Sequence, residues 1–242
     1  MQIEQVSYGE DGTLKGTLYG AGGSDKRPGL IVFPDIFGLG DHARERAQRL
    51  AGLGYVVLAA DLHGDGRMLA FEQAMDEFAS FNANPALPCG RGQAAWRFLH
   101  DTAGVDADRI GAVGFCYGGA LAFELARLGV PLAAAIGFHA TLGTSNPDGA
   151  SKVTAKILAC IGSEDPIVPA EQRAAFEREM RAADVDWQLH LYGGVYHSFT
   201  DRRSDGAGQP EVTRYSPSAD RRSWAAMVAL LDEVFGDHSL AR

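Results

Sequence analysis

The chain has 242 residues, of which 46% are hydrophobic and 22% are charged, values ordinary for a soluble globular protein. Its formal net charge of -9, with no dense run of lysine and arginine, excludes a basic surface for nucleic acid. No run of about 18 apolar residues occurs, so we expect no membrane span. The start, MQIEQVSYGEDG, has neither the basic nor the apolar segment of a signal peptide, and we expect a cytoplasmic protein.

The N-terminal segments IEQVSY and LKGTLYG flank GEDGT, which predicts an antiparallel hairpin with its turn at Asp11-Gly12. Short continuous apolar runs follow, typical of parallel strands buried on both faces. In chain order the expected strands are residues 29–34, 55–61, 110–115, 132–138, 155–162 and 187–193.

Helical segments separate these strands, and we place them at residues 42–54, 90–104, 118–129, 169–184 and 219–236. Because strand and helix alternate, the chain is predicted to form an α/β fold, a mostly parallel sheet with helices on both faces. No linker or repeat divides it, so we expect a single domain over residues 1–242. The long irregular stretch from Thr200 to Asp220 is polar and rich in Gly and Pro, and loops of that length are often functional.

Glycines crowd around Cys116, where an apolar strand gives way to a helix in RIGAVGFCYGGALAF. The segment from Gly114 to Gly118 matches a G-x-nucleophile-x-G elbow, in which the nucleophile occupies a strained turn. Glycines two positions before and after it avoid a collision between strand and helix. The alternative is that Cys116 is a small buried hydrophobe and the glycines only pack a helix on a strand.

Partners for such a nucleophile follow later strands of the same sheet. In this type of fold the acid and then the histidine come after the nucleophile in chain order. ILACIGSEDPIVP places Glu164 and Asp165 just past one strand, and LYGGVYHSF places His197 just past the next. The choice of Asp165 over Glu164 rests partly on Pro166, which fixes the turn that follows, and mainly on the family resemblance described below.

The other cysteines and a polar loop have simpler explanations. Three scattered cysteines form neither a disulfide framework nor a zinc site. Cys160 lies inside a strand and Cys89 near the start of a helix, so neither is expected to react. DLHGDG puts Asp61, His63 and Asp65 in one loop, and turn formation explains their presence without a metal ion.

The chain resembles the dienelactone hydrolase family of α/β-hydrolases, through FPDIFGL, GFCYGGALAF, GSEDPIVP and YHSF. The resemblance implies a Cys-His-Asp triad of Cys116, His197 and Asp165. It also implies an oxyanion hole formed by the backbone N–H groups of Ile36 and Tyr117. The segment HATLGTSNPDGASKVT is too short for a cap domain, so an open site for a small substrate is expected.

Further site residues come from the loop after the strand 29–34. Asp35 and Phe37 are expected to contact substrate or thiol, and His139, at the end of another strand, is expected to line the pocket. The family has a glutamate before Ile-Phe-Gly that contacts the resting thiol, whereas this chain has Asp35. The family also holds a substrate carboxylate with arginines. HSFTDRR supplies Thr200 and Asp201 there instead, so an acidic dienelactone is not the expected natural substrate.

These residues predict a cysteine-dependent hydrolase of small activated esters or lactones that acts through an acyl-thioester. The mechanism requires no metal and no organic cofactor. A thioesterase or acyl transferase would use the same residues, and a non-catalytic α/β-hydrolase homologue would bind a ligand in the same place. Phosphotriester hydrolysis is a further hypothesis. We expect a monomer or homodimer with a small-molecule substrate and no nucleic-acid or membrane partner.

Overall fold

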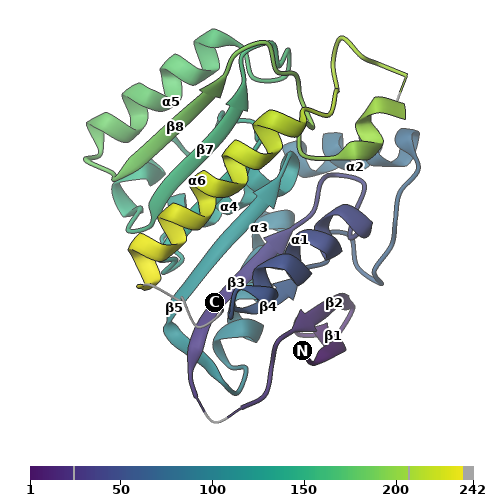
Figure 1. The fold of residues 1–242 in the computed structure, drawn as a ribbon, viewed down its shortest axis with the longest axis vertical. Coiled ribbons are helices and arrows are strands. Elements are labelled where there is room, and N and C mark those ends of the chain that lie inside the picture. The colour runs from purple at the N-terminus through teal and green to yellow at the C-terminus, as the bar shows by residue number, and fades with distance from the viewer. Residues whose placement is uncertain (24, 207, 237–242) are drawn as a thin grey trace.

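Eight strands form one sheet in the computed structural model, which describes residues 1–23, 25–206 and 208–236 (Figure 1). The order is β1-β2-β4-β3-β5-β6-β7-β8. The strands are β1 Ile3–Tyr8, β2 Leu14–Tyr19, β3 Arg27–Phe33, β4 Val56–Ala59, β5 Val105–Phe115, β6 Ala134–Phe138, β7 Lys156–Gly162 and β8 Trp187–Tyr192. Strands β3 to β8 pair in parallel, while β1 and β2 add an antiparallel hairpin beside β4. The predicted hairpin and all six later strands are confirmed.

Helices cover both faces of this sheet. They are α1 Asp41–Gly52, α2 Phe71–Ala83, α3 Ala86–His100, α4 Tyr117–Arg127, α5 Ala170–Ala182 and α6 Pro217–Phe235, with short 3-10 helices η1 Pro147–Lys152 and η2 Arg202–Gly206. Residues of α1 and α6 pack in one apolar cluster, and residues of α3, α4 and α5 pack in the other. In Figure 1, α1 and α6 lie in front of the sheet.

Strand β3 shows why the sheet is covered on both sides. Its residues Leu30, Ile31, Val32 and Phe33 are all fully buried. Because side chains alternate between the faces of a strand, Leu30 and Val32 join the cluster under α1 and α6, whereas Ile31 and Phe33 join the opposite one. A continuous apolar run therefore serves two cores at once.

Three features differ from the sequence-based expectation. Helix α2 was not predicted, and α3 begins at Ala86, so that Cys89 lies in its first turn. The stretch from Thr200 to Asp220 contains η2, and α6 begins within it at Pro217.

The connection between β6 and β7 contains only η1 and has no cap domain, as expected. Among the described residues, no helix combines the length and apolar character needed to cross a bilayer.

Candidate active site

Cys116 occupies the turn between β5 and α4. Its backbone has φ 52° and ψ -119°, a conformation that residues other than glycine rarely adopt. It is also the N-cap residue of α4, where the helix dipole favours a negative charge such as a thiolate. Its side chain is partly accessible, whereas Cys89 and Cys160 are buried.

The glycines around Cys116 are required by close backbone contacts. A Cβ atom on Gly114 would lie 2.1 Å from the carbonyl carbon of Gly118, and one on Gly118 would lie 2.3 Å from the oxygen of Pro34. Both distances are far below van der Waals contact. The predicted collision is therefore confirmed, and these contacts also bring the end of β3 against the start of α4.

The strand register gathers the other candidate residues at the same edge. Phe33 of β3 is paired with Gly114 of β5, and Phe115 is paired with Phe138 of β6. The carboxyl ends of these parallel strands therefore lie side by side, and the segments that follow the strands share one edge of the sheet. That edge carries Cys116 together with the residues after β3, β6, β7 and β8.

Asp165 and His197 meet at this edge. The Asp165 Oδ2 atom lies 2.7 Å from His197 Nδ1, and Asp165 Oδ1 accepts a hydrogen bond from the N–H of Ile167 at 2.9 Å. Both side chains are buried. Glu164 is exposed, and its carboxylate accepts a hydrogen bond from the hydroxyl of Ser163. Of the two acids that the sequence offered, the structure places Asp165 on the histidine.

Three backbone contacts hold the loop of His197 in place. A Cβ atom on Gly162 would lie 2.2 Å from the oxygen of Val195, so the loop after β8 packs directly on the end of β7. The N–H of His197 donates to the carbonyl of Val212, and the N–H of Arg214 donates to the carbonyl of His197. The segment after Thr200 thus returns to brace the histidine.

The other ring nitrogen of His197, Nε2, is buried and has no hydrogen-bond partner among the described residues. Burial on its own lowers the pKa of His197, but the charges of Cys116 and Asp165 outweigh it and raise this pKa to about 10. Cys116 is thus close enough to interact with the imidazole. Catalytic hydrogen bonds are often long in a ligand-free enzyme and shorten when substrate binds.

Ile36 lies two residues after Pro34, whose oxygen packs against Gly118, and Tyr117 directly follows Cys116 in the chain. Neither backbone N–H group takes part in a loop, cap or side-chain hydrogen bond of the described chain. Ile36 is buried, and Tyr117 packs against its cluster. The two N–H groups thus come from the two chain segments that Gly118 and Pro34 bring into contact.

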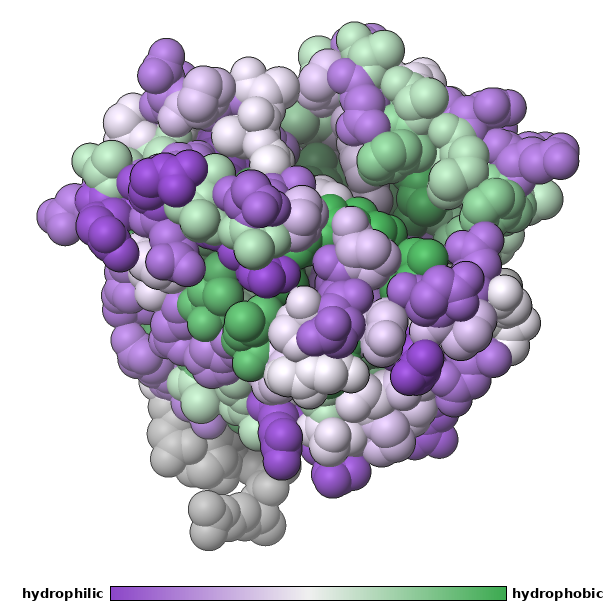
Figure 2. Space-filling model, turned by 90° about the horizontal axis from the view of Figure 1, so that it is seen from above, coloured by the Kyte–Doolittle hydropathy of each residue, from purple (hydrophilic) through white to green (hydrophobic). Residues whose placement is uncertain are grey.

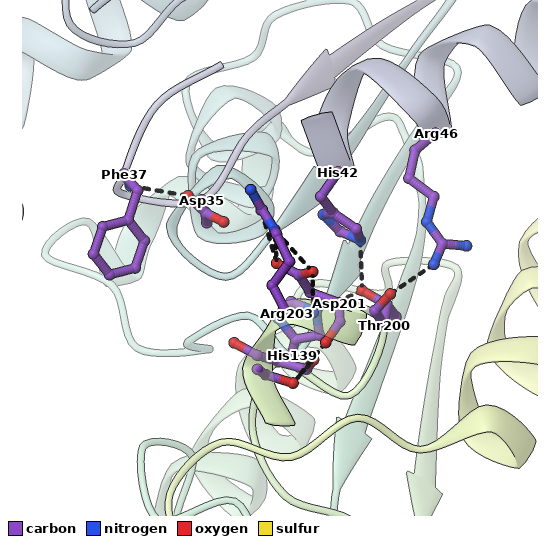
Figure 3. A network of polar contacts seen from close by, with 10 residues as sticks. Asp35, Phe37, His42, Arg46, His139, Thr200, Asp201 and Arg203 are labelled. Carbon is purple, nitrogen blue, oxygen red and sulfur yellow. Dashed lines mark hydrogen bonds and ion pairs between the residues drawn. The ribbon is translucent and has the colours of Figure 1, made fainter. Parts of the chain in front are cut away.

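Asp35 does not hydrogen-bond Cys116 in the described structure. Its Oδ1 accepts a hydrogen bond from the N–H of Phe37 at 2.9 Å, and Figure 3 shows Arg203 between Asp35 and Asp201. Burial raises the pKa of Asp35 to about 6, against the lowering effects of the Phe37 N–H and Arg203. Arg203, which the sequence analysis did not single out, is itself paired with Asp201 at 2.8 Å.

His139 is buried behind His197. The two rings are edge-on, with centroids 5.1 Å apart, and His139 Nε2 lies 2.9 Å from the hydroxyl of Thr200. The same hydroxyl lies 3.2 Å from His42 Nε2 (Figure 3). Burial lowers the pKa of His42 to about 4 and that of His139 well below its ordinary value. Both rings are therefore neutral, and His139 packs edge-on against the ring of His197.

In the loop DLHGDG, the carboxylate of Asp61 stabilises a turn. Asp61 accepts hydrogen bonds from the backbone N–H groups of Lys15, His63, Gly64 and Gly66. Within the described ranges, no group of three or more His, Cys, Asp or Glu residues is arranged to hold a metal ion.

A cavity of about 250 Å³ opens beside Tyr117. Aromatic side chains of α2, Phe78 and Phe81, line it together with Tyr117, Leu121 and Thr144. Seen from above, the molecular surface is hollowed near its centre, and hydrophobic residues lie in the hollow (Figure 2). Helix α2, which the sequence analysis missed, thus supplies part of the apolar surface next to the candidate nucleophile.

Comparison with known proteins agrees with this architecture. The sequence model of the dienelactone hydrolase family matches residues 14–235. A carboxymethylenebutenolidase of Pseudomonas putida is 28% identical over 207 residues, covering 81% of this chain and 85% of the relative.

Two solved structures are closely similar. One, named m3DLH, is 44% identical, with a TM-score of 0.92, and covers 97% of this chain and 98% of its own. The other, a dienelactone hydrolase-like promiscuous phosphotriesterase from metagenomic libraries, is 38% identical, with a TM-score of 0.91, and covers 97% and 99%. The chain therefore belongs to the dienelactone hydrolase family, and it is a lactone or ester hydrolase with the α/β-hydrolase fold.

Proposed function

We propose that this enzyme hydrolyses small activated esters or lactones through an acyl-thioester on Cys116. The observation that carries the proposal is the buried Asp165–His197 contact of 2.7 Å, which leaves Nε2 of His197 unpartnered among the described residues, with Cys116 among the groups that act on the ring. Asp165 can accept a hydrogen bond only from a protonated Nδ1, which leaves Nε2 as the base.

The reaction proceeds in two halves. His197 Nε2 takes the proton of the Cys116 thiol, and the thiolate forms a C–S bond to the carbonyl carbon. The negative oxygen of the tetrahedral intermediate accepts hydrogen bonds from Ile36 and Tyr117, and the leaving group departs with the proton from His197. Water then gives a proton to His197 and attacks the thioester, and the C–S bond breaks to release the acid and restore the thiol.

The nucleophile restricts the substrate class. A thiolate leaves a tetrahedral intermediate more readily than an alkoxide does, so attack on a simple alkyl ester tends to reverse. Enol lactones and aryl esters have acidic leaving groups and favour the forward direction. The aromatic side chains of Phe78, Phe81 and Tyr117 beside the site suit a small apolar or aromatic group.

The first test compares two esters. We expect p-nitrophenyl acetate to be turned over at least about 100-fold faster than ethyl acetate, because only the phenolate departs more readily than the thiolate. Steady-state kcat/KM for the two esters gives the ratio. Equal values would contradict a thiolate nucleophile.

Alkylation by iodoacetamide identifies which cysteine acts as the nucleophile. Iodoacetamide should label Cys116 rapidly, with loss of esterase activity, because burial raises the pKa of Cys89 to about 11 and that of Cys160 to about 12. Peptide mass spectrometry reads out each site. Equally slow labelling of all three cysteines would favour a non-catalytic ligand-binding protein.

A second substrate class is favoured by the similarity to a promiscuous phosphotriesterase at 38% identity. A phosphotriester also passes through a state with charge on an oxygen that the same two N–H groups could stabilise. We propose that the enzyme hydrolyses paraoxon by forming and then hydrolysing an S–P bond at Cys116. Release of p-nitrophenol should be lost in Cys116→Ala, and an unchanged rate in that variant would remove the proposal.

A further inference from the structure

His63 makes a direct contact with the loop that carries Ile36. Its Nε2 lies 2.8 Å from the carbonyl oxygen of Ile36, although the two residues are 27 positions apart in the chain. The imidazole is 2% exposed and stacks on the ring of Phe81 in α2, with centroids 5.7 Å apart and an interplanar angle of 13°. Its position is thus fixed by packing as well as by the hydrogen bond.

The nitrogen that faces Ile36 must carry the ring proton, because a carbonyl oxygen only accepts hydrogen bonds. The other nitrogen, Nδ1, is buried and unpartnered, with Glu77 Oε1 of α2 at 3.6 Å and Arg91 beyond it, 3.7 Å from the same oxygen. Burial lowers the pKa of His63, although the Ile36 carbonyl, Glu77 and Asp61 act in the opposite direction. The contact with the Ile36 carbonyl therefore requires a proton on Nε2.

The peptide group between Ile36 and Phe37 is held at both ends. Asp35 accepts from its N–H at 2.9 Å, and His63 donates to its carbonyl at 2.8 Å. A planar peptide group that is fixed at both ends leaves little freedom in the backbone torsions of Ile36. The direction of the preceding N–H, the one on Ile36 itself, is fixed as a consequence.

We propose that His63 is a positioning residue of the oxyanion hole. It holds the Ile36 peptide so that the Ile36 N–H, free of other partners, points at the oxygen where charge develops. Asp35 completes the clamp from the other side, and α2 supports it through Phe81. The inference rests on the proposed function, since it assigns His63 to the hole used by the Cys116 intermediate.

The test uses two substitutions with opposite chemistry. His63→Phe keeps an aromatic ring against Phe81 and removes the donor, whereas His63→Gln keeps an N–H that can reach the Ile36 carbonyl. For p-nitrophenyl acetate we expect His63→Phe to lower kcat about 10- to 100-fold with little change in KM, a part of the loss caused by deleting an oxyanion donor. His63→Gln should recover most of that loss.

Alkylation by iodoacetamide supplies the readout that separates positioning from general damage. It forms a C–S bond by direct displacement and creates no oxyanion, so the rate at Cys116 should be unchanged in His63→Phe. As a matched control, His100→Phe makes the same exchange at an exposed ring that lies tilted against Trp96 in α3, and its kcat should stay within about twofold of the wild-type value.

Each outcome has a distinct meaning. A fall of kcat and alkylation together in His63→Phe, an effect on KM alone, or no effect at all would overturn the role of His63. Failure of the proposed function would be seen in a different experiment: the Cys116→Ala variant would keep the esterase activity of the wild type.

Discussion

Cys116→Ala is expected to lower kcat for p-nitrophenyl acetate by about 10⁴-fold or more, because the variant lacks the atom that forms the covalent intermediate. Residual turnover would come only from the oxyanion hole and from binding. Burst and steady-state kinetics measure the effect, and the burst of p-nitrophenol should be absent. Thermal unfolding should change little, since the side chain is partly accessible and sits at a turn.

A second cysteine and a second substitution at Cys116 provide controls for Cys116→Ala. Cys160→Ala should leave kcat within about twofold of wild type, because this thiol is buried inside β7 and burial raises its pKa to about 12. Cys116→Ser keeps a nucleophile of similar size, but His197 must then deprotonate a far weaker acid, so activity should remain well below wild type. A Cys116→Ala variant that keeps more than about a tenth of wild-type kcat would contradict covalent catalysis by this residue.

Asp165→Asn is expected to lower kcat by about 10⁴-fold while leaving the geometry intact. An asparagine amide can donate to Nδ1 of His197, which forces the ring proton onto Nε2 and removes the base that faces Cys116. Glu164→Gln is the matched control, because Glu164 is the adjacent acid, is exposed, and accepts a hydrogen bond from the Ser163 hydroxyl. Its kcat should stay within about twofold of wild type.

Asp165→Asn should also change how the alkylation of Cys116 depends on pH. Burial lowers the pKa of His197, but Cys116 and Asp165 outweigh it and raise this pKa to about 10, so His197 accepts the thiol proton more readily in the wild type than without the Asp165 charge. Loss of the Asp165 charge lowers the pKa of His197, and the histidine then holds the thiol proton less well. The rate of Cys116 alkylation at pH 7 should fall, and its pH profile should move to higher pH. An unchanged profile in Asp165→Asn would show that Asp165 does not act through His197.

The strands were predictable because burial on both faces leaves a continuous apolar run in the sequence, as in β3 and β7. Helix α2 was not, because only Ala74 and Phe81 of its 13 residues are buried. The apolar residues Phe71, Met75 and Phe78 are exposed, so the sequence shows no single buried stripe. Because α2 packs beside the candidate site and not on the main core, its apolar residues do not recur at the spacing of a buried helix face.

By itself the sequence determined the fold class, the elbow around Cys116 and the two loops that carry Asp165 and His197. These features follow from local patterns, namely apolar runs, glycine spacing and the order of elements along the chain. Only the tertiary structure decided that the Asp165 carboxylate contacts Nδ1 of His197, that Thr200 reaches His139, and that His63 contacts the Ile36 carbonyl. Such contacts join residues 27 to 61 positions apart, and their geometry depends on how separate elements pack, which no local pattern encodes.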